Sequence, residues 1–178
     1  QAQGIYGVRM AVNLSAHQLR SASLVDTVSQ AIRRHGIQAG DLELEITESV
    51  VMKDPEAAIQ KLQALRNLGV SLAIDDFGTG YSSLAYLKLL PVDLLKIDRS
   101  FVKDIETDKN DAAICASILA LAHSLGLKVV AEGVETAAQR DFLHAHHCDY
   151  LQGYLFAKPE PGEQCLARLS RMQPAAQA

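Results

Sequence analysis

The chain has 178 residues, of which 48% are hydrophobic, and this length and composition suit one globular domain and exclude a disordered segment. Its 17 basic and 21 acidic residues give a formal net charge of −4. A nucleic-acid backbone is bound through a field of positive charge, so a nucleic-acid duplex is an unexpected partner, and a phosphate-bearing ligand would more readily be held through metal ions.

Cysteine usage and hydropathy indicate a cytoplasmic domain. Cys115, Cys148 and Cys165 are an odd number without a Cys-x-x-Cys pair, which favours reduced thiols that serve as packing residues. No apolar run approaches the roughly 18 residues of a membrane span, and no signal peptide opens the sequence. The chain starts at Gln1 rather than at a methionine, so we expect it to begin inside a longer parent protein, which a membrane anchor could tether.

Apolar runs of strand length alternate along the chain with helical patterns. The helices are marked by apolar residues three or four apart, by the start signal Asp54-Pro55 and by closing glycines such as Gly36. Strands and helices are predicted in turn over residues 8–15, 24–35, 42–47, 54–69, 71–76, 82–90, 92–98, 111–125, 127–133, 136–147, 149–153 and 161–171. Residues 173–178 are expected to be a frayed tail, which leaves a single domain over residues 1–172.

Strands that alternate with helices at this spacing predict a parallel sheet joined by right-handed crossovers. Each predicted strand ends in polar residues, which are Asn13, Glu45, Asp75, Asp76, Lys96, Glu132 and Gln152. A (β/α)₈ barrel places its chemistry at the carboxyl ends of its strands, whereas an open doubly wound sheet binds ligands near one switch point. We therefore expect an α/β fold, a TIM-barrel-like (β/α)₈ barrel, of which the chain supplies about six of the eight βα units.

Asp75 and Asp76 are adjacent carboxylates at the end of an apolar strand, followed by Gly78 and Gly80. Two neighbouring negative charges repel each other unless a cation lies between them, and Mg²⁺ and Mn²⁺ prefer oxygen ligands. Taken alone, the stretch is explained equally well as a turn, since Asp before Gly is ordinary loop chemistry. The metal hypothesis therefore depends on the other strand ends.

Six separate motifs occur in the order and spacing of a known family. They are Asn13-Leu-Ser15, Glu45-Ile-Thr-Glu-Ser49, Asp75-Asp-Phe-Gly-Thr-Gly-Tyr-Ser-Ser83, Lys96-Ile-Asp98, Ala131-Glu-Gly-Val-Glu135 and Gln152-Gly-Tyr-Leu-Phe-Ala-Lys-Pro159. From about Val8 to Pro159 the chain resembles the EAL-domain cyclic di-GMP phosphodiesterases. The resemblance implies that two Mg²⁺ or Mn²⁺ ions support hydrolysis of one phosphodiester of cyclic di-GMP to linear pGpG in bacterial signalling.

The resemblance also implies roles for single residues. Asn13, Glu45 and Asp75 match metal ligands, with Asp75 bridging the two ions and Asp76 serving the second. Lys96 matches the lysine that holds the attacking water. Glu132 matches a glutamate of the metal–water network or of proton abstraction, so that the expected catalytic residues are Lys96, Glu132 and Asp76.

Four further residues are expected to support the site, namely Glu48, Asp98, Glu135 and Gln152. Glu48 matches the glutamate that anchors the loop after Asp76, which the family uses for metal placement and for dimer contacts. The implied partners are therefore cyclic di-GMP and a second copy of the chain, bound through the Phe77–Ser83 loop and the following helix. Sensor or GGDEF-type domains are expected in front of this domain in the parent protein.

One part of the family's pattern is absent. The Glu-Ala-Leu motif, whose glutamate is a metal ligand and whose following arginine meets the substrate phosphate, does not occur in these residues. It is expected on the second of two strands that would precede residue 8. Six strands cannot close an eight-stranded barrel, so these residues alone are expected to expose two sheet edges and to be inactive or nearly so.

Several motifs have plainer interpretations. Asn13-Leu-Ser15 is also a glycosylation sequon, although a strand end in a protein without a signal peptide disfavours that use. Residues 144–148 are rich in histidine, but their crowding at a helix end favours surface residues over a zinc site. Lys96 and Asp98 could form a buried structural ion pair, and Glu132 and Glu135 could cap the next helix.

Two other functional classes remain open. One is a cyclic di-GMP receptor that binds without cleaving, against which the retained acidic residues and Lys96 argue. The other is an unrelated Mg²⁺ barrel of the enolase type, whose proton-abstraction chemistry does not explain the adjacent pair Asp75 and Asp76.

Overall fold

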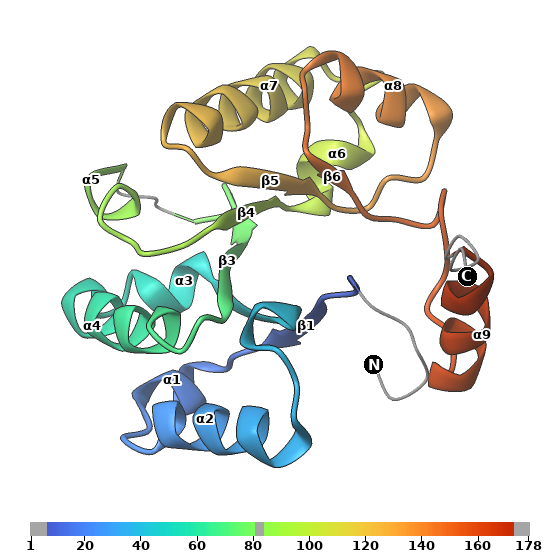
Figure 1. The fold of residues 1–178 in the computed structure, drawn as a ribbon. Coiled ribbons are helices and arrows are strands. Elements are labelled where there is room, and N and C mark those ends of the chain that lie inside the picture. Colours follow the sequence, from blue (N-terminus) through green and yellow to red (C-terminus); the bar gives the residue numbers. More distant parts are fainter. Residues whose placement is uncertain (1–6, 81–83, 173–178) are drawn as a thin grey trace.

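The computed structural model describes residues 7–80 and 84–172. Within these residues six parallel strands form one sheet in the order β1-β2-β3-β4-β5-β6, so that consecutive strands are neighbours. The strands are β1 Met10–Asn13, β2 Leu42–Thr47, β3 Ser71–Phe77, β4 Leu94–Ile97, β5 Lys128–Ala131 and β6 Tyr150–Leu151. The sheet curls into part of a barrel with helices outside it (Figure 1). The expected TIM-barrel-like fold is confirmed.

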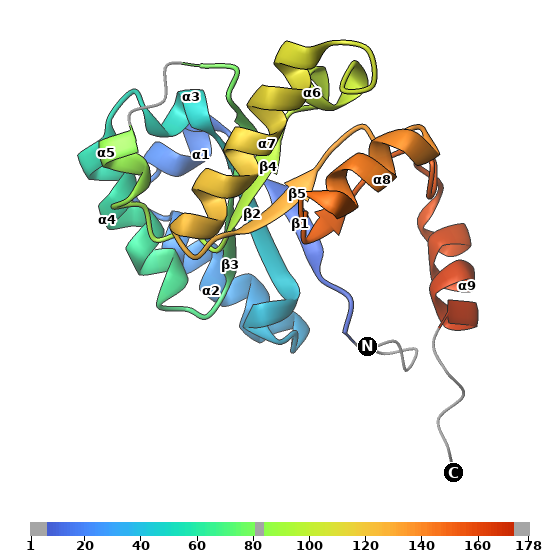
Figure 2. The same ribbon diagram turned by 90° about the horizontal axis from the view of Figure 1, so that it is seen from above.

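Helices α1 to α8 connect the strands and cover the convex face of the sheet in both views, and α9 follows the last strand (Figures 1 and 2). They are α1 Ala16–Arg20, α2 Leu24–His35, α3 Glu48–Val51, α4 Pro55–Arg66, α5 Leu84–Leu87, α6 Arg99–Lys103, α7 Lys109–Ser124, α8 Ala137–Ala145 and α9 Gly162–Met172, with a 3₁₀ turn, η1, at Ala39–Asp41. Helix α9 stands apart from the other helices on the open side of the sheet.

The helix signals in the sequence have the structural basis expected of them. The side chain of Asp54 accepts a hydrogen bond from the Ala57 amide and Pro55 occupies the first turn, so α4 begins where it was predicted. Helix α2 ends at Gly36, which adopts a left-handed conformation with φ 61°. Helices α1, α3 and α6 were not predicted, because four or five residues are too few to establish a helical period.

Four predicted elements need correction. The helix predicted over residues 82–90 is reduced to α5 within the described part of the chain, and residues 81–83 lie outside it. Strands β4, β5 and β6 are shorter than the apolar runs that predicted them, because a run continues into the turn at each end. The predicted tail, residues 173–178, also lies outside the described residues.

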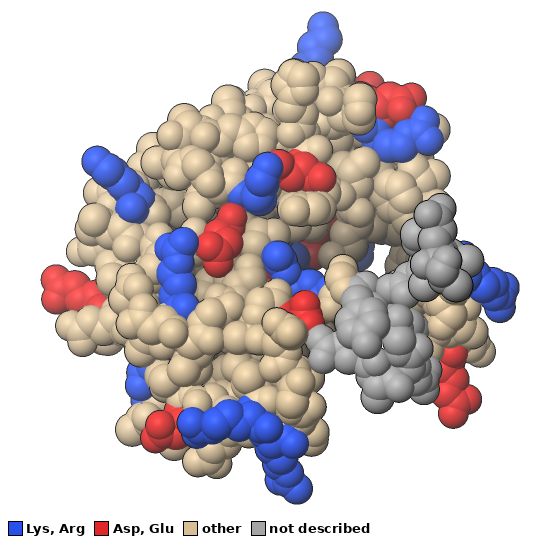
Figure 3. All heavy atoms as spheres, viewed as in Figure 1, with Lys and Arg blue, Asp and Glu red and all other residues tan. Residues whose placement is uncertain are grey.

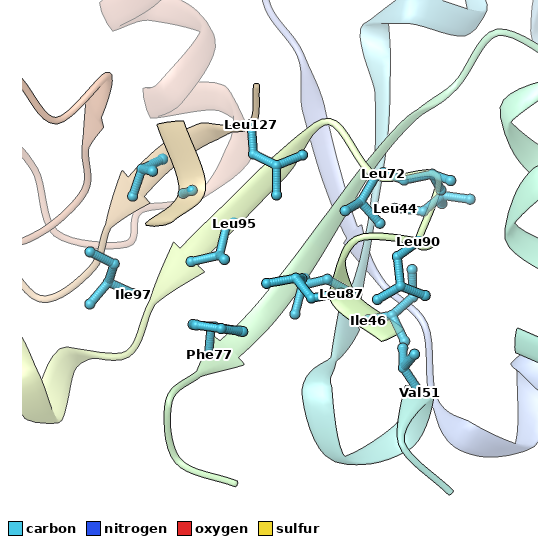
Figure 4. Packing of buried hydrophobic residues seen from close by; sticks show 14 of the residues in the cluster. Leu44, Ile46, Val51, Leu72, Phe77, Leu87, Leu90, Leu95, Ile97 and Leu127 are labelled. Carbon is cyan, nitrogen blue, oxygen red and sulfur yellow. The ribbon is translucent and has the colours of Figure 1, made fainter. Parts of the chain in front are cut away.

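The hydrophobic core lies between the convex face of the sheet and the helices. Leu72, Leu95 and Ile97 point away from the barrel interior and are fully buried under the helical layer (Figure 4). Burying each such side chain contributes about 1.5–3 kcal/mol. Because side chains alternate along a strand, the residues between them, such as Lys96, face the concave side. The core therefore fixes which residues line the barrel interior.

The cysteines differ from one another in burial. Cys115 is buried in α7 and Cys148 is partly buried, as packing residues should be, and burial raises the pKa of these thiols to about 12 and about 11. Cys165 is exposed on α9, so its prediction as a packing residue was wrong. All three are free thiols.

Two general features agree with the composition. On the face shown in Figure 3, basic and acidic side chains are mixed and form no single positive field. Across residues 7–80 and 84–172, the helices are either too short or too polar to cross a membrane.

Candidate active site

A buried lysine joins acidic side chains from three neighbouring strands at the carboxyl end of the sheet. Lys96 on β4 is 4% exposed. Its Nζ lies 2.8 Å from Oε1 of Glu45 on β2, 3.0 Å from Oδ1 of Asp75 on β3 and 2.8 Å from Oε1 of Glu132, directly after β5. The predicted convergence of strand-end residues is therefore present for four consecutive strands, β2 to β5.

The carboxylates determine the protonation of this lysine. Burial by itself lowers the pKa of Lys96, but hydrogen bonds to Glu132, Glu45 and Asp75 outweigh burial and raise the pKa well above its ordinary value. Lys96 is consequently a permanent cation at neutral pH. It can balance negative charge, but it has no lone pair with which to accept a proton.

Glu132 is shifted toward the protonated form. Burial raises the pKa of its carboxyl group, and the charges of Asp75 and Glu45 raise it further, while the ammonium of Lys96 offsets part of the effect. Glu132 is therefore a better proton acceptor than an ordinary solvent-exposed glutamate.

Asp75, Asp76 and Glu132 form a cluster of acidic oxygens. One carboxylate oxygen from each lies within 4.8 Å of the others. Burial raises the pKa of Asp76, and the charges of Asp75 and Asp98 add to that effect, against a smaller opposing effect of Lys96. A donor set of carboxylate oxygens whose repulsion Lys96 relieves only in part fits a hard divalent cation such as Mg²⁺ or Mn²⁺.

An irregularity in β3 brings the two adjacent aspartates to the same place. Ile74 pairs with Leu95 and Phe77 with Ile97, so β3 has an extra residue relative to β4 at this point. Asp76 adopts φ 53°, in the left-handed region, and its carbonyl accepts a hydrogen bond of 2.8 Å from Thr79 Oγ1. The predicted strand end at Asp76 was thus one residue short, because the strand resumes at Phe77 after the bulge.

Glu48 holds the loop that follows the aspartates. It is the first residue of α3 and only 2% exposed. Its Oε2 accepts a hydrogen bond of 3.1 Å from the amide of Gly78, and a methyl group at Gly80 would lie 3.3 Å from its Oε1. The expected contact between Glu48 and the glycine loop is present. Its role in dimer contacts stays a prediction, since Tyr81 to Ser83 lie outside the described residues.

The remaining predicted site residues lie at the rim or beyond it. Asn13 on β1 and Gln152 after β6 are exposed, at the two edges of the sheet, and Glu135 is exposed in the turn after β5. The proposed ion pair between Lys96 and Asp98 is wrong. Asp98 instead caps α6 by accepting a hydrogen bond of 2.9 Å from the Ser100 amide.

Sequence reasoning missed Gln139, a buried polar residue that is 4% exposed. Thr136 and Gln139 form a capping box at the start of α8, so neither Glu132 nor Glu135 caps that helix with its side chain, as had been considered. The signal was present, because Thr136 followed three residues later by Gln139 is the pattern of a capping box.

The histidines at the end of α8 do not form a metal site in the described part of the chain. His144, His146 and His147 are exposed, and the group of metal-binding side chains found among residues 7–80 and 84–172 is the acidic cluster alone. The interpretation as surface residues at a helix end is confirmed.

Comparison with known proteins gives a consistent result. The family model of the EAL domain matches residues 1–159. The chain is 52% identical over 161 residues to the bifunctional diguanylate cyclase/cyclic di-GMP phosphodiesterase MucR, and 54% identical over 154 residues to the cyclic di-GMP phosphodiesterase NbdA, both of Pseudomonas aeruginosa. These alignments cover 90% and 86% of the chain but only 24% and 20% of the relatives, so the chain spans about a quarter of their length or less.

Solved structures share the fold. A PaMucR phosphodiesterase complex with c-di-GMP has a TM-score of 0.89 at 50% identity, over 92% of this chain and 66% of the other. A manganese/cy-diGMP complex of BlrP1 from Klebsiella pneumoniae has a TM-score of 0.79 at 34% identity, over 88% of this chain and 40% of the other.

Proposed function

Because the chain belongs to the EAL domain family, we propose that it hydrolyses one phosphodiester bond of cyclic di-GMP to give linear pGpG, as a domain over residues 1–172. The observation that carries the proposal is the convergence of Glu45, Asp75 and Glu132 on the buried ammonium of Lys96 at the carboxyl end of a TIM-barrel-like sheet. The names of MucR and NbdA, and the c-di-GMP complex of PaMucR, support this choice of substrate.

The acidic cluster supports a requirement for divalent metal. We propose two ions, Mg²⁺ or Mn²⁺, which Asp75, Asp76, Glu45 and Asn13 would hold, with Asp75 shared and with Glu132 beside them in the acidic cluster. Bound there, such ions would lower the pKa of water and stabilise the charge of an in-line displacement at phosphorus. The manganese complex of BlrP1 supports manganese as one of the usable ions.

The side chains of the chain itself have distinct tasks in this reaction. Lys96 keeps its proton, so it offsets the negative charge that develops on the phosphodiester. It would orient the attacking water once a bound ion takes over one of its three carboxylate partners. Glu132, whose pKa is raised, accepts a proton from the water and later returns it to the departing oxygen. Glu48 keeps the loop after Asp76 in place through the Gly78 amide. Glu135, Gln152 and Asp98 act as supporting residues.

Assembly and location belong to the same proposal. We expect a homodimer through the Phe77–Ser83 loop and the following helix, together with sensor or GGDEF-type domains in the same protein, since MucR is named for a cyclase as well as a phosphodiesterase activity. We place the domain in the cytoplasm, where its substrate would be a bacterial second messenger.

A turnover assay with purified full-length protein tests the proposal. Cyclic di-GMP is incubated with Mg²⁺, Mn²⁺ or Ca²⁺, and pGpG is quantified by chromatography. Turnover is expected with the first two ions and at least tenfold less with Ca²⁺, which is larger and has looser geometry. Comparable rates with Ca²⁺ would contradict the proposed metal chemistry.

Substitution at the shared ligand tests the site. Asp75→Asn is expected to lower turnover by at least a hundredfold, because an amide is a poorer bridging ligand than a carboxylate. Asp54→Asn is the matched control, since asparagine caps α4 as well as aspartate does and Asp54 is not a member of the cluster. Tight binding of cyclic di-GMP without pGpG formation by the unsubstituted protein would instead identify a receptor.

A further inference from the structure

Helix α6 lies next to both acidic segments of the site. One segment is the aspartate loop, defined as residues 75–80, and the other is the glutamate turn, defined as residues 132–136. Helix α6 starts directly after Asp98, at the end of β4, the strand that carries Lys96. It packs against α7 in both views (Figures 1 and 2). The contacts of this five-residue helix reach the aspartate loop on one side and the glutamate turn on the other.

The contact with the aspartate loop is made by an aromatic ring. Gly78 has φ 96°, and a methyl group there would lie 2.9 Å from Cε2 of Phe101 and 3.3 Å from Cδ1 of Ile118. The ring of Phe101 therefore packs directly on the backbone of the loop two residues after Asp76. The same glycine donates its amide hydrogen to Glu48, so Gly78 is held by a ring and by a carboxylate.

The contact with the glutamate turn is made at the first residue of the helix. Gly133 has φ 71°, and a methyl group there would lie 2.6 Å from Cβ and 3.4 Å from Cα of Arg99. Because both of these atoms belong to or adjoin the backbone of α6, neither can move away without displacing the helix. The residue directly after Glu132 thus rests on α6.

A second contact joins the glutamate turn to the last residue of the helix. The buried Gln139 donates from Nε2 to the carbonyl of Lys103 at 2.9 Å. Its Oε1 accepts hydrogen bonds from the amides of Glu135 at 2.7 Å and Thr136 at 3.0 Å. A single amide side chain therefore fixes two backbone groups of the turn relative to the end of α6.

An isolated five-residue helix has almost no stability of its own, so α6 depends on these contacts to stay folded. The folded helix in turn keeps the aspartate loop and the glutamate turn in place. Its start is fixed by the hydrogen bond between Asp98 and the Ser100 amide, and Val102 anchors it in the core with no exposed surface. Lys96 offsets the repulsion between Asp75 and Glu132, but Asp76 forms no ion pair among the described residues. The repulsion between Asp76 and its acidic neighbours would displace the aspartate loop in the absence of another constraint.

We propose that α6 is a bracket that keeps the aspartate loop and the glutamate turn at the separation a divalent ion requires. Phe101 is a positioning residue for Asp76, acting through Gly78, and Gln139 is a positioning residue for Glu132, acting through the turn. The inference rests on the proposed function for the identity of the site. The inference is tested mainly by measuring Mn²⁺ binding, which can be done without turnover of cyclic di-GMP.

The first experiment removes the ring in the full-length protein by Phe101→Ala. The dissociation constant for Mn²⁺ is expected to rise about tenfold, and kcat for cyclic di-GMP to fall at least tenfold with little change in KM, as for other residues that orient metal ligands. Binding is measured by the electron paramagnetic resonance signal of free Mn²⁺. Phe101→Leu, which keeps apolar contact with Gly78, should recover part of both losses.

Val102→Ala is the matched control. It shortens another buried side chain of the same helix and should lower the melting temperature, but it leaves the contacts with Gly78 and Gly133 intact. Its dissociation constant for Mn²⁺ should stay within twofold of the unsubstituted protein. If Phe101→Ala and Val102→Ala lower the melting temperature alike and both leave Mn²⁺ binding unchanged, α6 is ordinary packing and the bracket is overturned.

A double substitution distinguishes one bracket from two separate supports. Gln139→Leu alone should also weaken Mn²⁺ binding, because it releases the glutamate turn. Once either segment is free, the required separation is lost, so the effect of combining Phe101→Ala with Gln139→Leu should be clearly smaller than the product of the single effects. If the change in the Mn²⁺ dissociation constant of the double variant equals the product of the two single changes, the two contacts act independently and the bracket is overturned. Failure to cleave cyclic di-GMP would refute the proposed function alone, since the Mn²⁺ measurements would still decide this inference.

Discussion

The polar residues at the ends of the four inner strands and of the two edge strands differ in burial and in ion pairing. Glu45, Asp75 and Lys96 on the inner strands are buried and joined in one charged network. Asn13 and Gln152, at the ends of the two edge strands, are exposed, although the sequence gives them the same kind of strand-end position. Position at the end of a strand is therefore alike in the two regions, and the neighbouring strands account for the difference in burial.

The comparison shows that a strand-end residue matters for stability when neighbouring strands on both sides bury it. An inner residue has strands on both sides and is removed from water, so its charge must be paired within the protein. An edge residue keeps water as a partner and can be changed at little cost in stability. The contribution of each strand-end residue to the free energy of unfolding should therefore fall from the centre of the sheet to its edges.

The largest effect is expected at the centre, from Lys96→Met. Removing the ammonium leaves three partly or fully buried carboxylates facing one another, and breaking such a pair costs about 3 kcal/mol. Denaturant unfolding of the full-length protein should show this loss, and added Mg²⁺ should restore part of it. Lys53→Met, at an exposed position outside the network, should change stability by less than about 0.5 kcal/mol. Equal effects of the two substitutions would refute the special role of the centre.

A smaller effect on stability, but a large one on turnover, is expected from Glu48→Ala. The substitution leaves the Gly78 amide without its carboxylate partner, at about 1–3 kcal/mol. Displacement of the aspartate loop should lower kcat by about a hundredfold. Glu48→Gln keeps an acceptor oxygen and should lose less than Glu48→Ala. Unchanged kinetics together with an unchanged sedimentation coefficient would exclude an anchoring role for Glu48.

Near the β6 edge, Asp149 should make a modest and pH-dependent contribution to the free energy of unfolding. Its carboxylate accepts hydrogen bonds from Lys128 at 2.6 Å, His123 at 2.9 Å and the Val129 amide at 3.0 Å. Burial raises the pKa of Asp149, but these three partners together outweigh burial and lower the pKa below its ordinary value. A lowered pKa in the folded state means that the deprotonated carboxylate stabilises the fold.

That stabilisation should be fully present above about pH 3.9, the ordinary aspartate pKa, and should be lost as the pH falls through the lower pKa of the folded state. Asp149→Asn should remove this part of the pH dependence and cost no more than about 1 kcal/mol at neutral pH, because Lys128 is exposed to solvent. Melting temperatures measured from pH 7 down to pH 3 would check it. An identical acid profile in both proteins would contradict the assignment.

The smallest effect on stability is expected at the β1 edge, from Asn13→Ala. In the chain of residues 1–178 Asn13 is exposed, so its replacement there should change the free energy of unfolding by less than about 0.5 kcal/mol. Mn²⁺ binding should nevertheless weaken if Asn13 is a metal ligand, as its match to the family implies. A large loss of stability would show that this edge is not free in the assembled protein.

Most of the fold could be predicted because it depends on local patterns. Strand β2 and helix α2 have the predicted bounds, since alternation and the Gly36 stop signal are properties of neighbouring residues. The bulge at Asp76 could not be predicted, because it is defined by pairing with β4, which no local pattern records. The partner of Asp98 could not be predicted either. Asp98 and Lys96 are two residues apart and so were expected on the same face of β4, which suggested an ion pair, but Asp98 instead accepts a hydrogen bond from the Ser100 amide.

The candidate site was predictable to the extent that parallel strands align their carboxyl ends. That rule brought Glu45, Asp75, Lys96 and Glu132 together, as the structure has them. It could not distinguish buried from exposed members, because burial depends on the number of neighbouring strands. It also could not identify Gln139 or Phe101, whose contacts join segments far apart in the sequence.

The strictly sequential order of the sheet has a consequence for how the chain acquires its structure. Each strand pairs with the strand immediately before it in the sequence, so every pairing closes a loop of one strand–helix unit. Low sequence separation between contacting segments favours fast folding, and a chain emerging from the ribosome can add each unit to the last. The carboxylates of β2 and β3 would then come together before Lys96 has been synthesised. Burial of that acidic face is therefore expected to wait for β4, whose Lys96 pairs with Glu45 and Asp75.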